Sequence, residues 1–185
     1  MTPDQNAALA VAVVGGLGVI GSYIYLSTTH KTSYVNSPLW LELGRSVTIP
    51  LTVLQMLAAV GFIAAIGSWI FGAPPDGGIM SLTAMLPVTL GFFLAASIAW
   101  AILVAQKNPP KAAVSVSLVV AAVTSILLLA GAAEEAKPRW WIVLGLILFC
   151  AVTVLADGVV WNARYLKRGI HYPKDEEPAS ISTDK

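Results

Sequence analysis

The chain has 185 residues, of which 57% are hydrophobic and 11% are charged. A soluble domain carries about 25% charged residues, so this composition excludes an ordinary soluble globular protein and is typical of a membrane protein. The formal net charge of +1 points to no nucleic-acid partner. Cys150 is the one cysteine, which excludes an internal disulfide.

Five apolar segments are long enough to cross a bilayer, whose core of about 30 Å needs about 20 mostly apolar residues per helix. They lie at residues 7–28, 47–71, 80–105, 112–132 and 140–163. The expected fold is therefore an all-α bundle of five transmembrane helices, in one domain at residues 1–165. Residues 166–185 are polar without an apolar period, and we expect a disordered tail there.

The first apolar segment is expected to be a retained span. Its flank, MTPDQN, lacks the basic residues that open a cleaved signal peptide. The segment continues into GSYIYLSTTHK, whose aromatic and basic residues are typical of a helix leaving the membrane.

The connection after the first span contains a helix-start signal in NSPLWLELGRS. Ser37 suits the N-cap and Pro38 the first helical position. Residues 38–44 therefore form either a separate interfacial helix that ends at Gly44, or an extension of the second span.

Prolines are expected to interrupt the helices at three places. Pro50 removes a backbone donor near the start of the second span, and Pro87 should kink the third span and free the carbonyl of Thr83. The two consecutive prolines of KNPPK predict a tight turn between the third and fourth spans.

The basic residues predict an orientation. Lysine and arginine are absent before the first span and between the second and third, and they recur in the connections after the first, third and fifth spans, at Lys31, Arg45, Lys107, Lys111, Arg164, Lys167 and Arg168. The connection after the fourth span blurs this pattern, since it has two basic residues, Lys137 and Arg139, beside two acidic ones. Under the positive-inside rule this alternation places the N-terminus outside and the C-terminus in the cytoplasm. Tryptophans near the ends of the segments agree with the same topology, since these side chains favour the membrane interfaces.

Small residues recur at spacings of three or four in the apolar segments, which lets helix backbones approach closely in lipid. The candidate packing positions are Gly15, Gly18, Gly21, Gly61, Ala65, Gly91 and Ala95. Packing within the bundle accounts for them, and so does an oligomer interface along one stripe. The sequence does not say which stripe faces outward.

Asp157 is the one acidic residue well inside a span. An unpaired carboxylate there is expensive, so such residues face the bundle interior, a water-filled cavity or a partner. Arg164 follows seven residues later on nearly the same helical face, and Arg45 begins the second span. A buried pair with one of these arginines, a proton or cation site, and a partly hydrated side chain without a special role are all open.

No cofactor is expected. His30 and His171 lie outside the apolar segments, which argues against a haem held within the membrane, and two histidines alone rarely bind a metal. The seven lysines also lie outside these segments, which excludes a retinal Schiff base within the membrane. No Ser/His/Asp or Cys/His arrangement falls inside a span, so we expect no enzyme.

A resemblance rests on the order LW, then LQMLAAVGF in the second span, then LADGVVWN in the fifth. The chain resembles uncharacterised multi-span membrane proteins of large DNA viruses of algae and of plankton. The resemblance implies a virion or host-membrane protein and no particular activity.

Two functions remain open from the sequence. The first is a structural or assembly component of a membrane complex or virion membrane, partnered by the lipid bilayer and by a second copy or another membrane protein. The second is a small channel or transporter in which Asp157 is the proton or cation site. Helix-packing residues support the first, and a single intramembrane carboxylate supports the second.

Overall fold

A computed structural model describes residues 1–30, 45–72, 86–106, 108–133 and 140–169. Regular structure within these ranges is helical: α1 Pro3–His30, α2 Arg45–Phe71, α3 Leu86–Val104, α4 Lys111–Ala133, α5 Trp140–Ala151, the π-helix η3 Val152–Trp161, and α6 Asn162–Arg168. The last three run on from one another, so the described residues contain five helices long and apolar enough to cross a membrane. The prediction of an all-α bundle with five such helices is confirmed.

The fifth span is longer than its apolar run. Its helix continues to Arg168, so the first residues of the polar segment are helical. It ends at Gly169, which adopts a φ of 74° and whose N–H donates to Tyr165 O at 2.7 Å. A positive φ is unfavourable for residues with a Cβ, whereas glycine adopts it without a steric cost.

Pro50 lies near the start of the second span, as expected, whereas Pro87 lies at the start of α3 and not in its interior. Pro50 lies inside α2, which continues through it as helix. Pro87 lies in the first turn of α3, where a missing N–H removes no helical hydrogen bond, so no kink arises there. Thr83 and the predicted helix at 38–44 lie outside the described residues.

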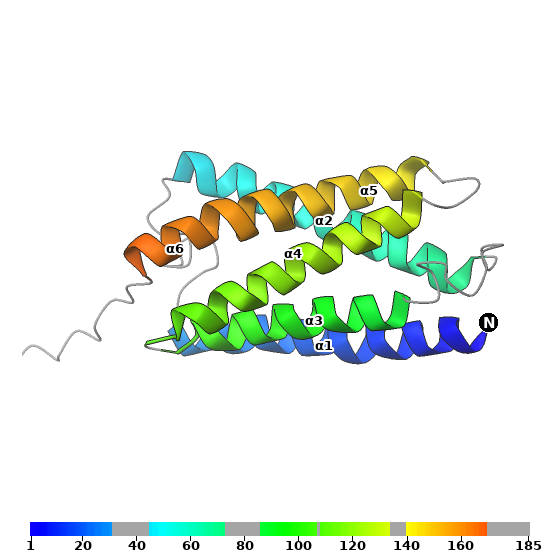
Figure 1. The fold of residues 1–185 in the computed structure, drawn as a ribbon, viewed down its shortest axis with the longest axis horizontal. Helices are drawn as coiled ribbons and strands as arrows, with labels where there is room; N and C mark the ends of the chain where they lie inside the picture. Colours follow the sequence, from blue (N-terminus) through cyan, green and yellow to red (C-terminus); the bar gives the residue numbers. More distant parts are fainter. Residues whose placement is uncertain (31–44, 73–85, 107, 134–139, 170–185) are drawn as a thin grey trace, which may run out of the picture.

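The helices form two pairs with α4 between them (Figure 1). α1 runs parallel to α3, with Gly15 against Leu94 and Gly18 against Ile98, whereas α2 runs antiparallel to the α5–η3–α6 helix. α4 lies obliquely between the pairs and contacts α3, α5 and η3. Helices α1 and α2 are consecutive in sequence but belong to different pairs.

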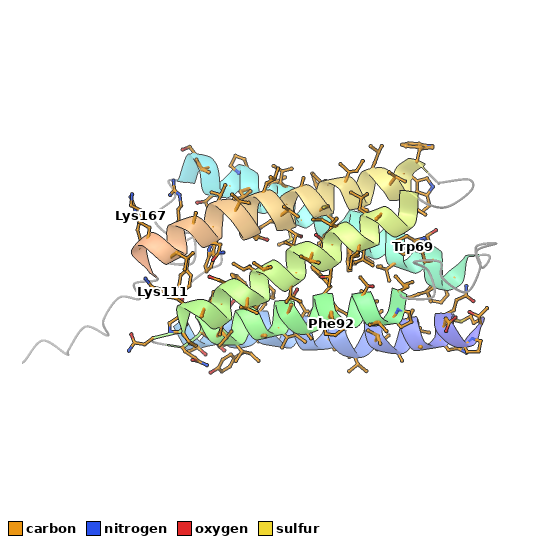
Figure 2. All side chains as sticks on the ribbon, viewed as in Figure 1. Trp69, Phe92, Lys111 and Lys167 are labelled. Atoms are coloured by element: carbon orange, nitrogen blue, oxygen red, sulfur yellow. The ribbon has the colours of Figure 1, made fainter. Side chains whose placement is uncertain are left out.

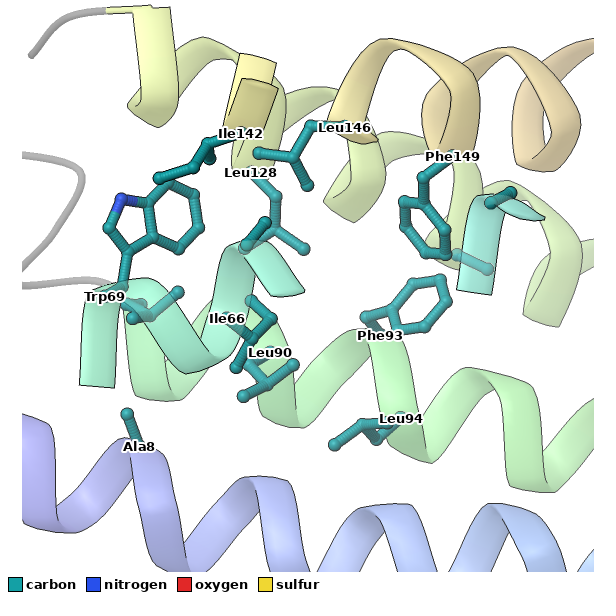
Figure 3. Close-up of a cluster of buried hydrophobic side chains, with 14 of the residues drawn as sticks. Ala8, Ile66, Trp69, Leu90, Phe93, Leu94, Leu128, Ile142, Leu146 and Phe149 are labelled. Carbon is teal, nitrogen blue, oxygen red and sulfur yellow. The ribbon is translucent and has the colours of Figure 1, made fainter. Parts of the chain in front are cut away.

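The apolar core lies where the two pairs meet α4 (Figure 3). Its centre is a three-ring cluster from three helices. The Phe62 and Phe149 rings stack with centroids 4.3 Å apart, and the Phe93 ring lies 5.0 Å from Phe149 and 5.3 Å from Phe62. Aromatic pairs at these separations attract one another beyond their buried area. The cluster therefore joins α2, α3 and α5.

A hydrogen-bonded contact joins α1 to α2 at one end of the bundle. Gln5 Nε2 donates to Trp69 O at 3.3 Å and to Gly72 O at 3.0 Å. Trp69 lies in the last turn of α2, and Gly72 follows the last residue of the helix. The side chain of Gln5 thus fixes the start of α1 against the end of α2.

Several small residues permit close helix contacts. A Cβ added to Gly15 would lie 2.5 Å from Leu94 Cδ1, and one added to Gly18 would lie 2.7 Å from Ile98 Cδ1. A Cβ on Gly61 would lie 2.9 Å from Gly145 Cα. Helix pairs α1–α3 and α2–α5 therefore approach at distances that glycine allows.

The remaining candidate packing positions are divided between the interior and the surface. Ala65 is fully buried, and a Cβ on Gly91 would make ordinary contact with Val11 Cγ1 at 3.7 Å. Gly21 and Ala95 are exposed, and a Cβ on Gly21 would meet nothing within 4 Å. These two residues lie on faces that the described helices leave uncovered.

Candidate functional site

The candidate site is built around Asp157, in the middle of η3. This segment is a π-helix, and the N–H of Asn162 bonds to Asp157 O, five residues back. Next to Asp157, a Cβ on Gly158 would lie 3.3 Å from the carbonyl oxygen of Thr153. Glycine therefore suits this turn. π-Helical turns are rare and are frequent at functional sites, because the wider turn redirects side chains.

The carboxylate of Asp157 contacts α2. Gln55 Nε2 donates to Asp157 Oδ1 at 3.3 Å, across a separation of 102 residues in sequence. Both side chains are half-buried in the bundle. The structure thus brings Asp157 against the second span, which was the expected neighbour, but the residue that meets it is an amide.

Arg164, one of the two arginines proposed as partners, does not form this contact in the described residues. Arg164 is half-buried, and no ion pair joins it to Asp157 in the part of the chain that the structure describes. The side chain of Arg45 lies outside the described atoms. The described hydrogen bond to the carboxylate therefore comes from a neutral amide, and the proposed pair with Arg164 is not formed in the described residues.

Aromatic rings from three helices surround the same region. Tyr23 of α1 is close enough to Asp157 to experience its charge, and its ring centroid lies 6.2 Å from that of Trp100 on α3. Trp100 makes an edge contact with Trp161 at 5.5 Å, and Trp161 stacks on Tyr165 at 5.0 Å. Because Trp161 follows Asp157 by one turn, this chain of rings ties the π-helix to α1 and α3.

One polar atom among these rings lacks a hydrogen bond. Trp100 Nε1 is buried and has no hydrogen-bond partner within the described ranges. This donor lies on α3, between the rings of Tyr23 and Trp161.

Most hydroxyl groups inside the spans bond to their own helices. Representative pairs are Thr52 with Thr48 O at 2.8 Å, Ser97 with Phe93 O at 2.9 Å, and Thr153 with Phe149 O at 2.9 Å. A hydroxyl bonded to a preceding carbonyl needs no water. These side chains are therefore compatible with a dry helix interface.

The described residues contain no group of three His, Cys, Asp or Glu side chains placed to hold a metal ion. The His30 side chain and His171 lie outside the description. Ser125 Oγ and Cys150 Sγ lie 3.8 Å apart, so the one cysteine contacts a hydroxyl of α4.

Five apolar membrane-length helices define this chain as an integral, multi-pass membrane protein. Comparison with known proteins adds no family: no protein-family model, no curated protein and no solved structure matches the chain.

Sequence reasoning found Asp157 but missed its partner and its surroundings. Gln55 is the one amide side chain in the segment at 47–71, and that rarity was the available signal for a buried contact. Gly145 packs against Gly61. No small residues at regular spacing around Gly145 predicted this contact. Nothing in the local sequence signalled the π-helical turn.

Proposed function

We propose that the protein is a structural or assembly component of a membrane complex or virion membrane, without chemistry of its own. The observation that carries this proposal is the two-sided distribution of glycine on α1. Gly15 and Gly18 pack on α3, whereas a Cβ on Gly16 or Gly21 would meet nothing within 4 Å. Glycine weakens a helix by about 1 kcal/mol relative to alanine, so glycines without a close neighbour need another explanation.

A second helix against this outer face supplies that explanation. α1 and α2 bury the smallest shares of their apolar windows within the chain, and the exposed face of α1 carries Leu17, Ile20 and Ile24 beside Gly21. Small residues flanked by large apolar ones allow close helix association in lipid. We assign this face to a second copy of the chain.

The proposed orientation has the N-terminus outside and the C-terminal segment in the cytoplasm. The loop charges support it, and so does the placement of Lys111, Arg164 and Lys167 at one end of the bundle. The resemblance to multi-span viral proteins favours a virion or host membrane as the location.

Mass measurement in mild detergent, combined with cysteine cross-linking, tests the proposal. In a Cys150→Ser background, Gly21→Cys should give a covalent dimer under oxidation. The matched control is Val123→Cys, at an exposed position on α4, which should remain monomeric. A monomeric mass at every protein concentration, together with equal cross-linking of the two variants, would contradict the proposal.

A small proton or cation transporter is the second candidate, and the observation that favours it is Asp157 itself. The carboxylate lies in a π-helix inside the bundle, and its described hydrogen bond comes from the neutral Gln55. Purified protein in liposomes should then carry a selective proton or cation flux that Asp157→Asn abolishes. Absence of flux from folded wild-type protein would reject this candidate and leave the assembly proposal standing.

A further inference from the structure

Basic side chains gather at one end of the bundle. Lys111 begins α4, and Arg164, Lys167 and Arg168 lie on α6. We call these four residues the α4/α6 basic cluster. Figure 2 shows Lys111 and Lys167 at the same end of the molecule. Arg164, Lys167 and Arg168 are spaced by three and four residues, which places them on one face of the helix.

Three hydrogen bonds fix the two helices of this cluster to each other. Lys111 Nζ donates to Leu166 O at 3.0 Å, and Tyr165 OH donates to Pro109 O at 3.2 Å. One turn further into the bundle, Ser115 Oγ donates to Asn162 Oδ1 at 2.8 Å. These hydrogen bonds therefore hold the start of α4 and its basic residue against α6 and its basic residues.

Compensation of the partial negative charge at the C-terminal end of α6 does not account for all four basic residues. Basic residues favour a helix C-terminus because its last carbonyls lack partners. On α6, however, Leu166 O already accepts from Lys111, and Tyr165 O accepts from the N–H of Gly169. The side chain of Lys167 is exposed beyond these contacts. Positive charge thus remains available at the surface.

The surroundings of the cluster are those of a membrane boundary. Leu166, between the basic residues of α6, is 48% exposed, and Tyr25, in the part of α1 that ends at the same side, is 52% exposed. Apolar surface next to clustered positive charge matches the two parts of an anionic phospholipid, its acyl chains and its phosphate. A free phosphate ion would use only the charge.

We propose that the α4/α6 basic cluster binds the phosphate group of an anionic phospholipid. Lys111 and Lys167 approach the headgroup from the two helices, and Arg164 and Arg168 complete the positive surface. The exposed Leu166 contacts the acyl chains. This inference is independent of the assembly function proposed above, since it concerns α4 and α6 and not the outer face of α1.

Native mass spectrometry of the full chain tests this lipid site. The probes are phosphatidylglycerol and phosphatidylcholine with identical acyl chains, added separately in mild detergent. We expect preferential retention of phosphatidylglycerol by the wild type, and a loss of about fivefold in apparent affinity for it in Lys167→Gln, which removes one exposed basic charge. Equal retention of the two lipids by the wild type would overturn the proposal.

Two control variants separate the site from general charge effects. Lys167→Arg/Arg168→Lys keeps both charges and should retain the preference. Lys137→Gln/Arg139→Gln removes two charges from the connection between α4 and α5 and should also retain it. An equal loss in this second control would overturn the proposal, as would complete displacement of the lipid by inorganic phosphate at low millimolar concentration. Helical circular dichroism of each variant verifies that it is folded.

Discussion

Gly61 of α2 and Gly145 of α5 meet backbone to backbone. A Cβ on Gly61 would lie 2.9 Å from Gly145 Cα, which is closer than Cβ atoms normally come, and a Cβ on Gly145 would lie 3.0 Å from Gly61 O. A helix main chain cannot move aside as a flexible side chain can. This crossing therefore sets the separation of α2 and α5, the pair on which the Gln55–Asp157 contact depends.

Gly61→Ala should destabilise the protein by about 1–3 kcal/mol, because the added methyl group forces α2 and α5 apart. Unfolding in mixed micelles with increasing SDS measures the change. Gly67→Ala is the matched control, since a Cβ there would meet nothing within 4 Å. If the two substitutions have the same effect, helix propensity and not the crossing decides the outcome.

Phe149→Ala should cost about 3 kcal/mol in the same assay, because it removes the ring shared by Phe62 and Phe93 and leaves a cavity. Phe92→Ala provides the control on the neighbouring face of α3, where the ring is 60% exposed. Its effect should be well below that of Phe149→Ala. Comparable losses would show that the three-ring cluster has no special role in stability.

Gln55→Leu should destabilise the fold more than Asp157→Asn. The first change removes the described donor to a half-buried carboxylate, at a cost of about 1–3 kcal/mol, whereas asparagine can still accept a hydrogen bond from Gln55. A double-mutant cycle with Gln55→Leu and Asp157→Leu should give a coupling energy of about 0.6 kcal/mol or more. Strictly additive effects would show that the contact contributes nothing to stability.

The orientation proposal predicts that Thr2→Cys and Ser182→Cys, each in the Cys150→Ser background, are labelled from opposite sides of the membrane. A membrane-impermeant thiol reagent applied to sealed vesicles should react with Thr2→Cys from the outside. Ser182→Cys should react only after the membrane is permeabilised. Labelling of both positions from the same side contradicts a five-span topology.

The sequence alone determined the class of the protein and the number of its spans. Hydrophobic length is a local property, because each helix satisfies its own backbone hydrogen bonds in lipid. For this reason the second and fifth segments, at 47–71 and 140–163, agree closely with α2 and with the start of α5. The continuation to Arg168 was missed because polar residues extend a helix beyond the bilayer core without an apolar signal.

The sequence also identified Asp157, since a carboxylate in an apolar segment stands out whatever the fold. Its partner depended on tertiary structure. Gln55 lies 102 residues away, and only the antiparallel packing of α2 against the fifth span brings the amide to Asp157 Oδ1. The sequence offered Arg164 on the same helix face and Arg45 at the start of the second span, because helical periodicity reports neighbours within one helix and does not fix which residues of two helices meet.

Tertiary structure likewise decided which small residues pack and which stay exposed. Gly15 and Gly21 occur in one glycine-rich segment, yet Gly15 meets Leu94 while Gly21 meets no atom within 4 Å. In lipid the two faces of a helix contact equally apolar surroundings, so hydrophobic pattern cannot distinguish inside from outside. The parallel pairing of α1 with α3, and not with its sequence neighbour α2, supplies that distinction.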